Sequence, residues 1–220
     1  MKYKILNLYA CLGGNRYKWD QVADIEVTAV ELDPECARLY QKRFPDDTVI
    51  VADAHQYLLD HYKEFDFIWS SPPCPTHSRI QTSLKLRDTF KPCYPDMKLY
   101  EEVIFLKQFF EGKYCVENVI PYYDLLIPGH KRGRHIYWTN FNLPNILSTR
   151  KESIGGLNEH KRLEKFHDYK CKANIGGYRD VLRNLVDYEA GRTILETALN
   201  IVSKSNTQQA ELIFYFHKIK

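Results

Sequence analysis

The stretch Lys4-Ile-Leu-Asn-Leu-Tyr-Ala-Cys-Leu-Gly-Gly-Asn15, followed by Glu26-Val-Thr-Ala-Val-Glu-Leu32, decides the fold class. Its first part is an apolar strand that ends in a glycine turn, and its last part is a β-branched strand. The polar residues between them, 16–24, are expected to form a helix. Pro34 suits the first turn of a second helix, in which apolar residues recur at helical spacing. Such alternation is typical of βαβ units.

The same alternation continues through the first two thirds of the chain. Further strands are predicted at Thr48–Ala52, Phe65–Ser70, Tyr114–Glu117 and His135–Trp138, and helices at Gln56–Tyr62 and 98–111. These segments together predict an α/β fold, a doubly wound, mainly parallel, Rossmann-like sheet with helices on both faces.

The periodicity weakens after residue 140, which divides the chain into three predicted regions. We expect a main α/β domain over residues 1–140, a small basic insert over 141–180, and a C-terminal region over 181–220 that packs back on the main domain. Within the last region, helical periodicity returns at Leu182–Val202, and a strand-like run follows at Leu212–His217.

Composition and charge set the class of protein. The chain has 220 residues, of which 44% are apolar, 27% charged and 14% aromatic, which excludes a disordered tail, a collagen-like fibre and a coiled coil. The net charge of +3 is unevenly spread, because residues 128–192 carry +6 and the rest of the chain −3. A basic segment beside an acidic body suits a surface that faces a polyanion.

The cysteines and the hydropathy pattern predict a cytoplasmic protein without a membrane span or a metal site. No apolar run has the length of a signal peptide or a membrane span. The six cysteines lack paired spacing, so we expect reduced thiols, although their even number leaves a disulfide framework arithmetically open. No Cys/His cluster has the spacing of zinc ligands.

Polar and conformationally special residues follow the predicted strands, at the edge where parallel sheets bind ligands. Cys74 lies between prolines at a strand end, where a rigid backbone suits a nucleophile, although a buried structural thiol is the alternative. Glu117 can hydrogen-bond a heterocycle, or it is a solvated carboxylate before a turn-forming Asn. The turn Gly13-Gly14 with Glu31 suits a nucleoside cofactor whose ribose hydroxyls bind the acid.

The order of these motifs resembles that of the cytosine-C5 DNA methyltransferases, notably the short forms of bacteria and phages. The resemblance covers residues 4–138 and, more loosely, 179–202. It rests on the segments Asn7–Gly14, Ala29-Val30-Glu31-Leu32-Asp33, Asp53, Ser71-Pro72-Pro73-Cys74, Glu117-Asn118-Val119, Arg132-Gly133-Arg134 and Arg183-Asn184-Leu185-Val186.

The chain departs from the family pattern in three places. Its opening motif carries Asn7, Tyr9 and Cys11 where the family usually has Asp, Phe and Gly, and a Cβ at Cys11 narrows the room beside the cofactor. The Gln that usually precedes the Arg-x-Arg pair is missing. Only about 40 residues lie between Trp138 and Arg179, so the target-recognition region is small, which predicts a short recognition sequence or loose specificity.

The resemblance implies transfer of a methyl group from S-adenosylmethionine to C5 of cytosine in DNA, with S-adenosylhomocysteine as product. It implies that the Cys74 thiolate adds to C6 of a flipped base, that Glu117 binds N3 and the exocyclic amine, and that Arg134 binds the oxygen at C2. The residues implied to hold the cofactor are Tyr9, Cys11, Leu12, Gly13, Gly14, Glu31, Leu32, Asp53, Ala54, Pro72 and Asn184.

The resemblance implies that the partner is double-stranded DNA. It also implies a monomer that belongs to a bacterial or phage restriction–modification system. Residues 75–98 carry a net charge of +3 without regular periodicity, which favours a loop that closes over DNA, although an ordinary solvated loop is the alternative. The implied DNA contacts are Arg79, Lys85, Arg87 and Arg132, and the basic residues of 150–172 suit backbone contact.

Three other functions stay open at this point. The same chemistry on RNA or a free cytidine nucleotide would suit the small recognition region. A catalytically weak DNA-binding homologue would suit the altered opening motif. A Rossmann-type oxidoreductase is disfavoured because a full GxGxxG is missing, and the lack of a phosphate-binding loop argues against hydrolysis of ATP or GTP.

Overall fold

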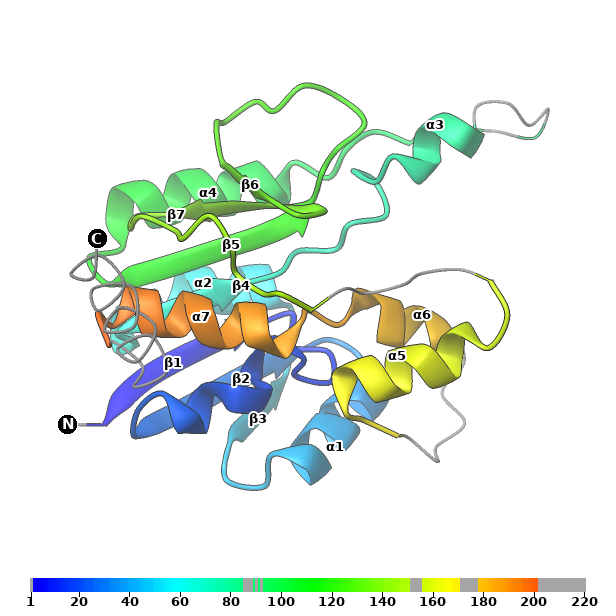
Figure 1. The fold of residues 1–220 in the computed structure, drawn as a ribbon. Coiled ribbons are helices and arrows are strands. Elements are labelled where there is room, and N and C mark those ends of the chain that lie inside the picture. Colours follow the sequence, from blue (N-terminus) through cyan, green and yellow to red (C-terminus); the bar gives the residue numbers. More distant parts are fainter. Residues whose placement is uncertain are drawn as a thin grey trace, which may run out of the picture.

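A computed structural model describes residues 2–84, 89, 91, 93–150, 156–170 and 178–201. Its described strands form a seven-stranded sheet in the order β3-β2-β1-β4-β5-β7-β6 (Figure 1). The strands are β1 (Tyr3–Leu8), β2 (Ile25–Glu31), β3 (Thr48–Val51), β4 (Phe67–Ser70), β5 (Lys113–Val119), β6 (His130–Arg132) and β7 (His135–Thr139). Strands β1 to β5 are parallel, and β7 runs antiparallel to β5 and β6. The predicted α/β fold is confirmed.

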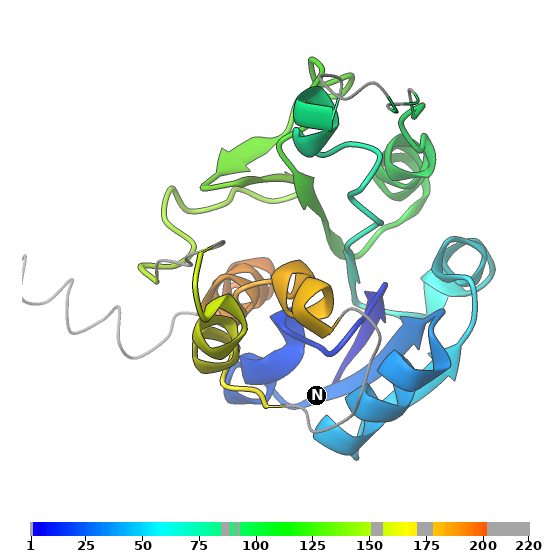
Figure 2. The ribbon, with the colours of Figure 1, turned by 90° about the vertical axis from the view of Figure 1, so that its right-hand side faces the viewer.

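Helices cover both faces of this sheet (Figures 1 and 2). One face carries α2 (Ala54–His61) and α4 (Lys98–Phe109), and the other carries α1 (Pro34–Arg43), α7 (Tyr188–Ala198) and the 3₁₀ helix η1 (Asn15–Gln21). The remaining elements are η2 (Tyr62–Glu64), α3 (Ile80–Leu84), α5 (Glu159–His167) and α6 (Tyr178–Asn184).

The central strands are buried on both faces, which explains their apolar runs. On β1, Leu6 and Leu8 pack toward α2 and α4, whereas Ile5 packs toward η1 and α7. On the second face, the Trp19 ring of η1 lies 6.0 Å from the Trp69 ring of β4. Each strand therefore ends between two packed layers, which fixes the position of the residues that follow it.

The segment predicted as a helix at 16–24 is the shorter 3₁₀ helix η1. Val22 N donates to Trp19 O over three residues, the spacing of a 3₁₀ turn. This spacing places Arg16, Trp19 and Val22 on one side, toward the protein interior. The indole nitrogen of Trp19 then donates to Gly191 O of α7 at 3.1 Å, which ties η1 to that helix.

The C-terminal helical run predicted at Leu182–Val202 is broken into α6 and α7. Asp187 begins α7 as its N-cap and accepts from Glu189 N at 3.1 Å. At the break, Val186 O packs against Gly14, where a Cβ would lie only 2.6 Å from that oxygen. The strand-like run Leu212–His217 lies outside the described residues.

Helix α5 and strand β6 lie in segments where the sequence predicted no element. The inward face of α5 carries Glu159, Leu163 and His167, so polar residues occupy two of three buried positions and the apolar periodicity is lost. Strand β6 is the polar run His130-Lys131-Arg132 at the sheet edge, where alternation of apolar residues is absent.

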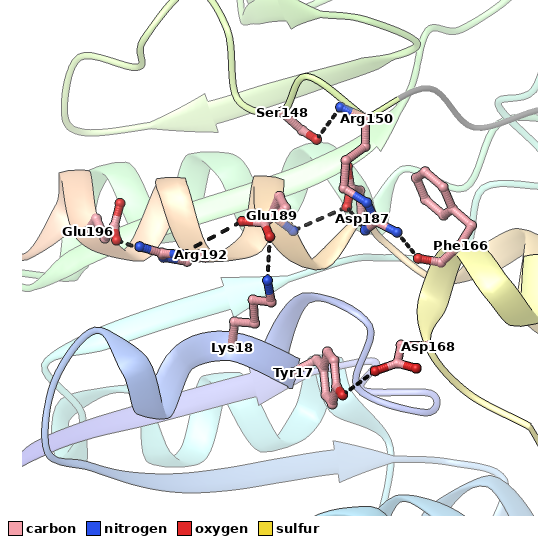
Figure 3. Close-up of polar contacts among 10 residues, drawn as sticks. All are labelled: Tyr17, Lys18, Ser148, Arg150, Phe166, Asp168, Asp187, Glu189, Arg192 and Glu196. Atoms are coloured by element: carbon pink, nitrogen blue, oxygen red, sulfur yellow. Dashed lines mark hydrogen bonds and ion pairs between the residues drawn. The ribbon is translucent and has the colours of Figure 1, made fainter. Parts of the chain in front are cut away.

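A group of six residues joins the segment after β7 to α7 and η1, and is called the tether network below (Figure 3). It comprises Tyr17, Lys18, Arg150, Asp168, Asp187 and Glu189. The Arg150 guanidinium contacts Asp187 Oδ1 at 2.6 Å, donates to Phe166 O and lies 3.8 Å from the centre of the Tyr188 ring. Lys18 pairs with Glu189, and Tyr17 Oη donates to Asp168 at 2.7 Å.

The predicted insert thus packs on the main body through this network, and Leu143 and Leu147 join the core beside α7. The division into three regions stays a prediction. Among the described residues, no helix combines the length and the apolar character that crossing a membrane requires.

Candidate active site

A cavity of about 590 Å³ lies at the carboxyl ends of the parallel strands. This volume is typical of small-molecule sites, which range over roughly 300–1,000 Å³. The residues that line it lie at or just after the ends of β1, β2, β3 and β4, or around the start of α4: Tyr9, Glu31, Leu32, Asp33, Pro34, Asp53, Ala54, Pro72, Pro73, Asp96 and Lys98. Six residues of the predicted cofactor set are among them: Tyr9, Glu31, Leu32, Asp53, Ala54 and Pro72.

The Glu31 carboxylate holds the turn that follows β1. Its Oε2 accepts from Cys11 N at 2.7 Å and its Oε1 accepts from Asp33 N at 2.9 Å. Tyr9 and Cys11 both have positive φ, at 55° and 47°, a conformation that non-glycine residues rarely adopt. The bond to Glu31 therefore helps to hold a strained turn beside the cavity. Each carboxylate oxygen keeps a further lone pair for a ligand hydroxyl.

Acidic groups dominate the cavity lining. Asp53 caps α2 by accepting from Gln56 N at 3.0 Å, and its carboxylate lies 3.6 Å from Lys98 Nζ. This backbone hydrogen bond and the nearby Lys98 charge lower the pKa of Asp53, so its carboxylate is ionised at neutral pH. With Glu31, Asp33, Asp53 and Asp96 against Lys98, the lining carries an excess of negative charge that suits a cationic ligand.

The other predicted cofactor residues are not among those that line the cavity. Cys11 contributes its backbone N–H to Glu31, and Leu12 is fully buried. A Cβ at Gly13, whose φ is +67°, would lie 2.4 Å from the Phe44 ring, and Gly14 packs on Val186. Asn184 is exposed at the end of α6. Their part in cofactor binding stays a prediction.

A buried carboxylate beneath the cavity was not predicted. Glu102 of α4 is fully buried, and it accepts from Tyr9 Oη at 2.6 Å and from Ser70 Oγ at 2.5 Å. His55 Nδ1 of α2 lies 3.1 Å from the same carboxylate. The carboxylate thus joins the ends of β1 and β4 to two helices. Burial and the adjacent Glu102 raise the pKa of Tyr9, which keeps its hydroxyl as a donor. The sequence signal that could have revealed this residue is a glutamate, Glu102, among the apolar positions of the helix predicted at 98–111.

Cys74 lies in a loop that hydrogen bonds hold on both sides. Its carbonyl accepts from His77 N and Ser78 N, both at 3.0 Å. The loop is joined to the segment after β5, because Tyr122 N donates to His77 O at 3.1 Å. Burial, and then the negative charge of Glu117, raise the pKa of the half-buried Cys74 thiol. The free thiol is therefore protonated at neutral pH.

Glu117 and Asn118 end the buried part of β5 and have different tasks. Asn118 Nδ2 donates to Pro72 O at 2.9 Å, which joins β5 to the proline loop. The Asn118 amide thus holds the loop of Cys74 in place. This hydrogen bond places Glu117, the neighbour of Asn118, on the strand that holds the Cys74 loop, and the negative charge of Glu117 helps to raise the pKa of Cys74.

The third predicted catalytic residue is placed differently. Arg134 lies in the turn between β6 and β7 and is exposed. The residue that contacts Glu117 is its neighbour His135, whose Nε2 lies 3.5 Å from Glu117 Oε1. Arg134 and His135 are adjacent in the sequence. Which of the two side chains contacts Glu117 depends on the register of β7 against β5, which the hydropathy pattern of the sequence does not give.

The predicted DNA contacts fall into three groups. Arg79 is exposed just before α3. Arg132 donates to the carbonyls of Pro144 at 2.6 Å and Leu143 at 3.1 Å, so it holds the chain that leaves β7. Lys85 and Arg87 lie outside the described residues. Contact of these side chains with DNA stays a prediction. Within the described residues, no group of three His, Cys, Asp or Glu side chains could hold a metal ion.

The fold and its edge define a doubly wound α/β protein with a ligand cavity beside a cysteine and a carboxylate. The family model for C-5 cytosine-specific DNA methylases matches residues 3–119, just over half of the chain. The chain belongs to this family, and its membership supports methyl transfer. The matched segment runs from β1 to the end of β5, and includes Cys74 and Glu117.

Comparison with solved structures gives distant similarities only. A DNMT2 variant of Spodoptera frugiperda is 23% identical over 53% of this chain, with a TM-score of 0.38. EhMeth, a methyltransferase of Entamoeba histolytica, is 14% identical over 54% of this chain and 38% of its own (TM-score 0.35). A TehB-like SAM-dependent methyltransferase of Corynebacterium glutamicum is 16% identical over 53% of this chain and 55% of its own (TM-score 0.34). This chain spans 35% of the DNMT2 chain. No curated protein matches it.

Proposed function

We propose that this protein transfers a methyl group from S-adenosylmethionine to C5 of cytosine in duplex DNA, through a covalent adduct on Cys74. The observation that carries the proposal is that Asn118, the neighbour of Glu117, hydrogen-bonds the proline loop of Cys74 at 2.9 Å, and that prolines of this loop line the cavity. The enzyme is proposed to act as a monomer on a cytosine turned out of the double helix, because a stacked base keeps its C6 from the thiol.

The cavity fits S-adenosylmethionine on the chemistry of its lining. Glu31 and Asp53 offer carboxylate oxygens to ribose hydroxyls and to the adenine amine, and the excess of acidic groups suits the cofactor's cationic centres. Leu32 is 67% exposed and offers an apolar surface to the flat adenine ring. When bound, S-adenosylmethionine supplies a methyl group activated by a positively charged sulfur.

The protein's own residues prepare the base and the nucleophile. In the free enzyme, Glu117 helps to keep the Cys74 thiol protonated by raising its pKa. A cytosine that hydrogen-bonds to Glu117 would screen this negative charge, so that the thiolate forms when the substrate is in place. The thiolate would then add to C6, and Glu117 would stabilise the adduct through N3 and the exocyclic amine.

A labelled-methyl transfer assay tests the proposal and its alternatives. The purified protein is incubated with methyl-labelled S-adenosylmethionine and, separately, with duplex DNA, RNA or cytidine nucleotides. We expect label in duplex DNA, and digestion of that DNA should give 5-methylcytosine. Label in RNA or nucleotides alone would contradict the DNA substrate, and no label in any of them would contradict the enzyme.

The covalent step is tested with Cys74→Ser. We expect this variant to lose methyl transfer, because a hydroxyl is a far weaker nucleophile than a thiolate, while calorimetry shows nearly unchanged binding of S-adenosylmethionine. Cys93→Ser is the matched control, because Cys93 is an exposed cysteine outside the cavity lining. Methyl transfer by Cys74→Ser at the wild-type rate would refute the covalent mechanism.

A further inference from the structure

We infer that His135, rather than Arg134, completes the polar clamp on the base, as a positioning residue that holds the Glu117 carboxyl and shares a proton with it. The inference rests on the proposed function and adds a residue to its site. The family match ends at residue 119 and so says nothing about β7.

Strand register brings His135 to Glu117. In the antiparallel pair of β5 and β7, Glu117 lies opposite Tyr137, and His135 lies opposite Val119. His135 is therefore the diagonal neighbour of Glu117, within reach of a long side chain. The two side chains meet with Nε2 at 3.5 Å from Oε1, and contacts at catalytic sites often shorten when the substrate binds.

The surroundings of Glu117 require such a partner. Its side chain is only 8% exposed, and a buried carboxylate is costly unless an opposite charge or a hydrogen bond compensates it. Among the described residues, His135 is the one ion-pair partner of Glu117. The imidazole itself is 27% exposed and packs edge-on against the buried Tyr137 ring, so it is held in place yet open to solvent on one side.

Arg134 lacks this placement. It lies in the turn before β7, and its carbonyl accepts from Ile120 N at 3.2 Å, which closes the turn against the end of β5. An arginine is also charged at any pH at which the enzyme works, whereas an imidazole can give up its proton. The two neighbours therefore offer different chemistry, and only His135 contacts the catalytic carboxyl in the described structure.

The proton balance of the addition step explains what the pair does. When the Cys74 thiolate forms its bond to C6, the C5–C6 double bond is lost and electron density moves through the ring to N3. The proton that His135 held passes to the Glu117 carboxylate and from there to N3, so that Glu117 is ionised again after the addition and the imidazole is neutral. After the methyl group has reached C5, the N3 proton returns to the Glu117–His135 pair. A water molecule takes the C5 proton, the C5–H electron pair re-forms the C5–C6 double bond, and the Cys74 thiolate leaves.

The test uses duplex DNA whose target cytosine is 5-fluorocytosine, in the presence of S-adenosylmethionine. Fluorine cannot leave C5 as a proton, so a covalent protein–DNA complex accumulates and its rate reports the steps up to methyl transfer. We expect His135→Ala to slow the formation of this complex by about 100-fold, the usual size of an acid–base contribution. His135→Gln keeps an amide donor for Glu117 and should be intermediate.

Chemical rescue separates this role from a structural one. His135 is partly exposed, so added imidazole should restore at least a tenth of the lost rate to His135→Ala, whereas acetate at the same concentration should not. His130→Ala removes a histidine from the adjacent strand β6, opposite Tyr137, and serves as the matched control with an unchanged rate.

The outcomes distinguish the inference from the function on which it rests. If the wild-type protein forms no covalent complex, the proposed function fails. If the wild type forms it and His135→Ala and His135→Gln do so equally fast, while Arg134→Ala does not, the inference is wrong and the predicted role of Arg134 is restored. Loss of rate in His135→Ala without rescue by imidazole, with His135→Gln at the wild-type rate, would also overturn the proton-sharing role.

Discussion

The carboxyl edge of the sheet and the tether network contain the same kinds of side chain and use them in different ways. At the edge, Glu31 and Asp53 line the cavity, and Glu117 affects a half-buried thiol. In the tether network, Arg150 directs its guanidinium to Asp187 and to the Phe166 carbonyl (Figure 3). The same guanidinium stacks on the Tyr188 ring. A position at the end of a parallel strand therefore indicates a residue that lines the cavity better than the local density of charge does.

This difference has a direct experimental consequence. Substitutions at the edge should change the chemistry and leave the free energy of unfolding nearly unchanged. Substitutions in the tether network should lower the free energy of unfolding, because its charges compensate one another inside the protein. The predictions below can confirm or break this division.

The largest effect is expected for Glu117→Gln. The amide keeps the shape of the side chain but cannot give a proton to N3, so single-turnover methyl transfer should fall by about 100- to 10,000-fold. The free energy of unfolding should not fall in urea, because the amide keeps the shape of the side chain and removes a charge whose burial is costly. Glu101→Gln on exposed α4 surface is the control and should match the wild type in both measurements. A large loss of stability without a loss of rate would place Glu117 with the tether network instead.

A smaller effect, on stability, is expected for Arg150→Ala. The substitution leaves the mostly buried Asp187 without its guanidinium and removes the stacking on Tyr188. Breaking a fully buried pair costs about 3–5 kcal/mol, and the partial exposure of both side chains reduces the expected loss to about 2 kcal/mol in urea unfolding.

Lys161→Ala is the matched control for Arg150→Ala, because Lys161 is an exposed cation on α5. It should change the free energy of unfolding by less than about 0.5 kcal/mol. Unchanged stability of Arg150→Ala together with weaker DNA binding would return Arg150 to the predicted DNA-contacting surface.

The reactivity of the Cys74 thiol should depend steeply on pH. Its pKa is raised by burial and by Glu117, and the thiolate is the reactive form. The rate of alkylation of Cys74 by iodoacetamide, followed peptide by peptide in a mass spectrometer, should rise about 10-fold per pH unit through neutral pH and level off only above the usual thiol pKa. Exposed Cys93 in the same digest is the internal control.

The same measurement separates two effects of Glu117. Removing its negative charge in Glu117→Gln lowers the pKa of Cys74, so alkylation should reach its plateau at a lower pH than in the wild type. Methyl transfer should nevertheless be slower in that variant. An alkylation profile identical to the wild type would show that the two groups do not interact.

The fold and much of the edge could be predicted from the sequence because both follow from strand periodicity. In a parallel sheet, residues that follow successive strands meet at one edge, so Tyr9, Glu31, Asp53 and Pro72 could be placed together before the structure was known. The predicted strands agree best with the observed ones where the strands are buried on both faces, because the sequences of such strands are apolar runs.

The other parts depend on long-range contacts that local patterns do not carry. Glu102 sits on an otherwise apolar helix face, and its partners Tyr9 and Ser70 come from distant strands. The contact between His135 and Glu117 depends on the register of β7 against β5. Helix α5 was not predicted because the buried Glu159 interrupts its apolar face. The Glu159 carboxylate pairs with Arg183 of α6, a contact that the local sequence does not indicate.

The smallest effect is expected for Arg79→Ala, which tests whether residues at the carboxyl edge of the sheet also contact DNA. Arg79 is exposed at the loop that follows Cys74, where a phosphate could meet it without displacing a partner such as those of Arg150. Arg79→Ala should weaken binding to duplex DNA several-fold at low salt. It should also reduce the slope of log K against log salt by about 0.9, the value for one phosphate contact. Lys107→Ala removes the same charge from the far end of α4 and should leave the slope unchanged. Equal slopes for Arg79→Ala and the wild type would remove Arg79 from the interface and would confine the contacts with DNA to other residues of the edge.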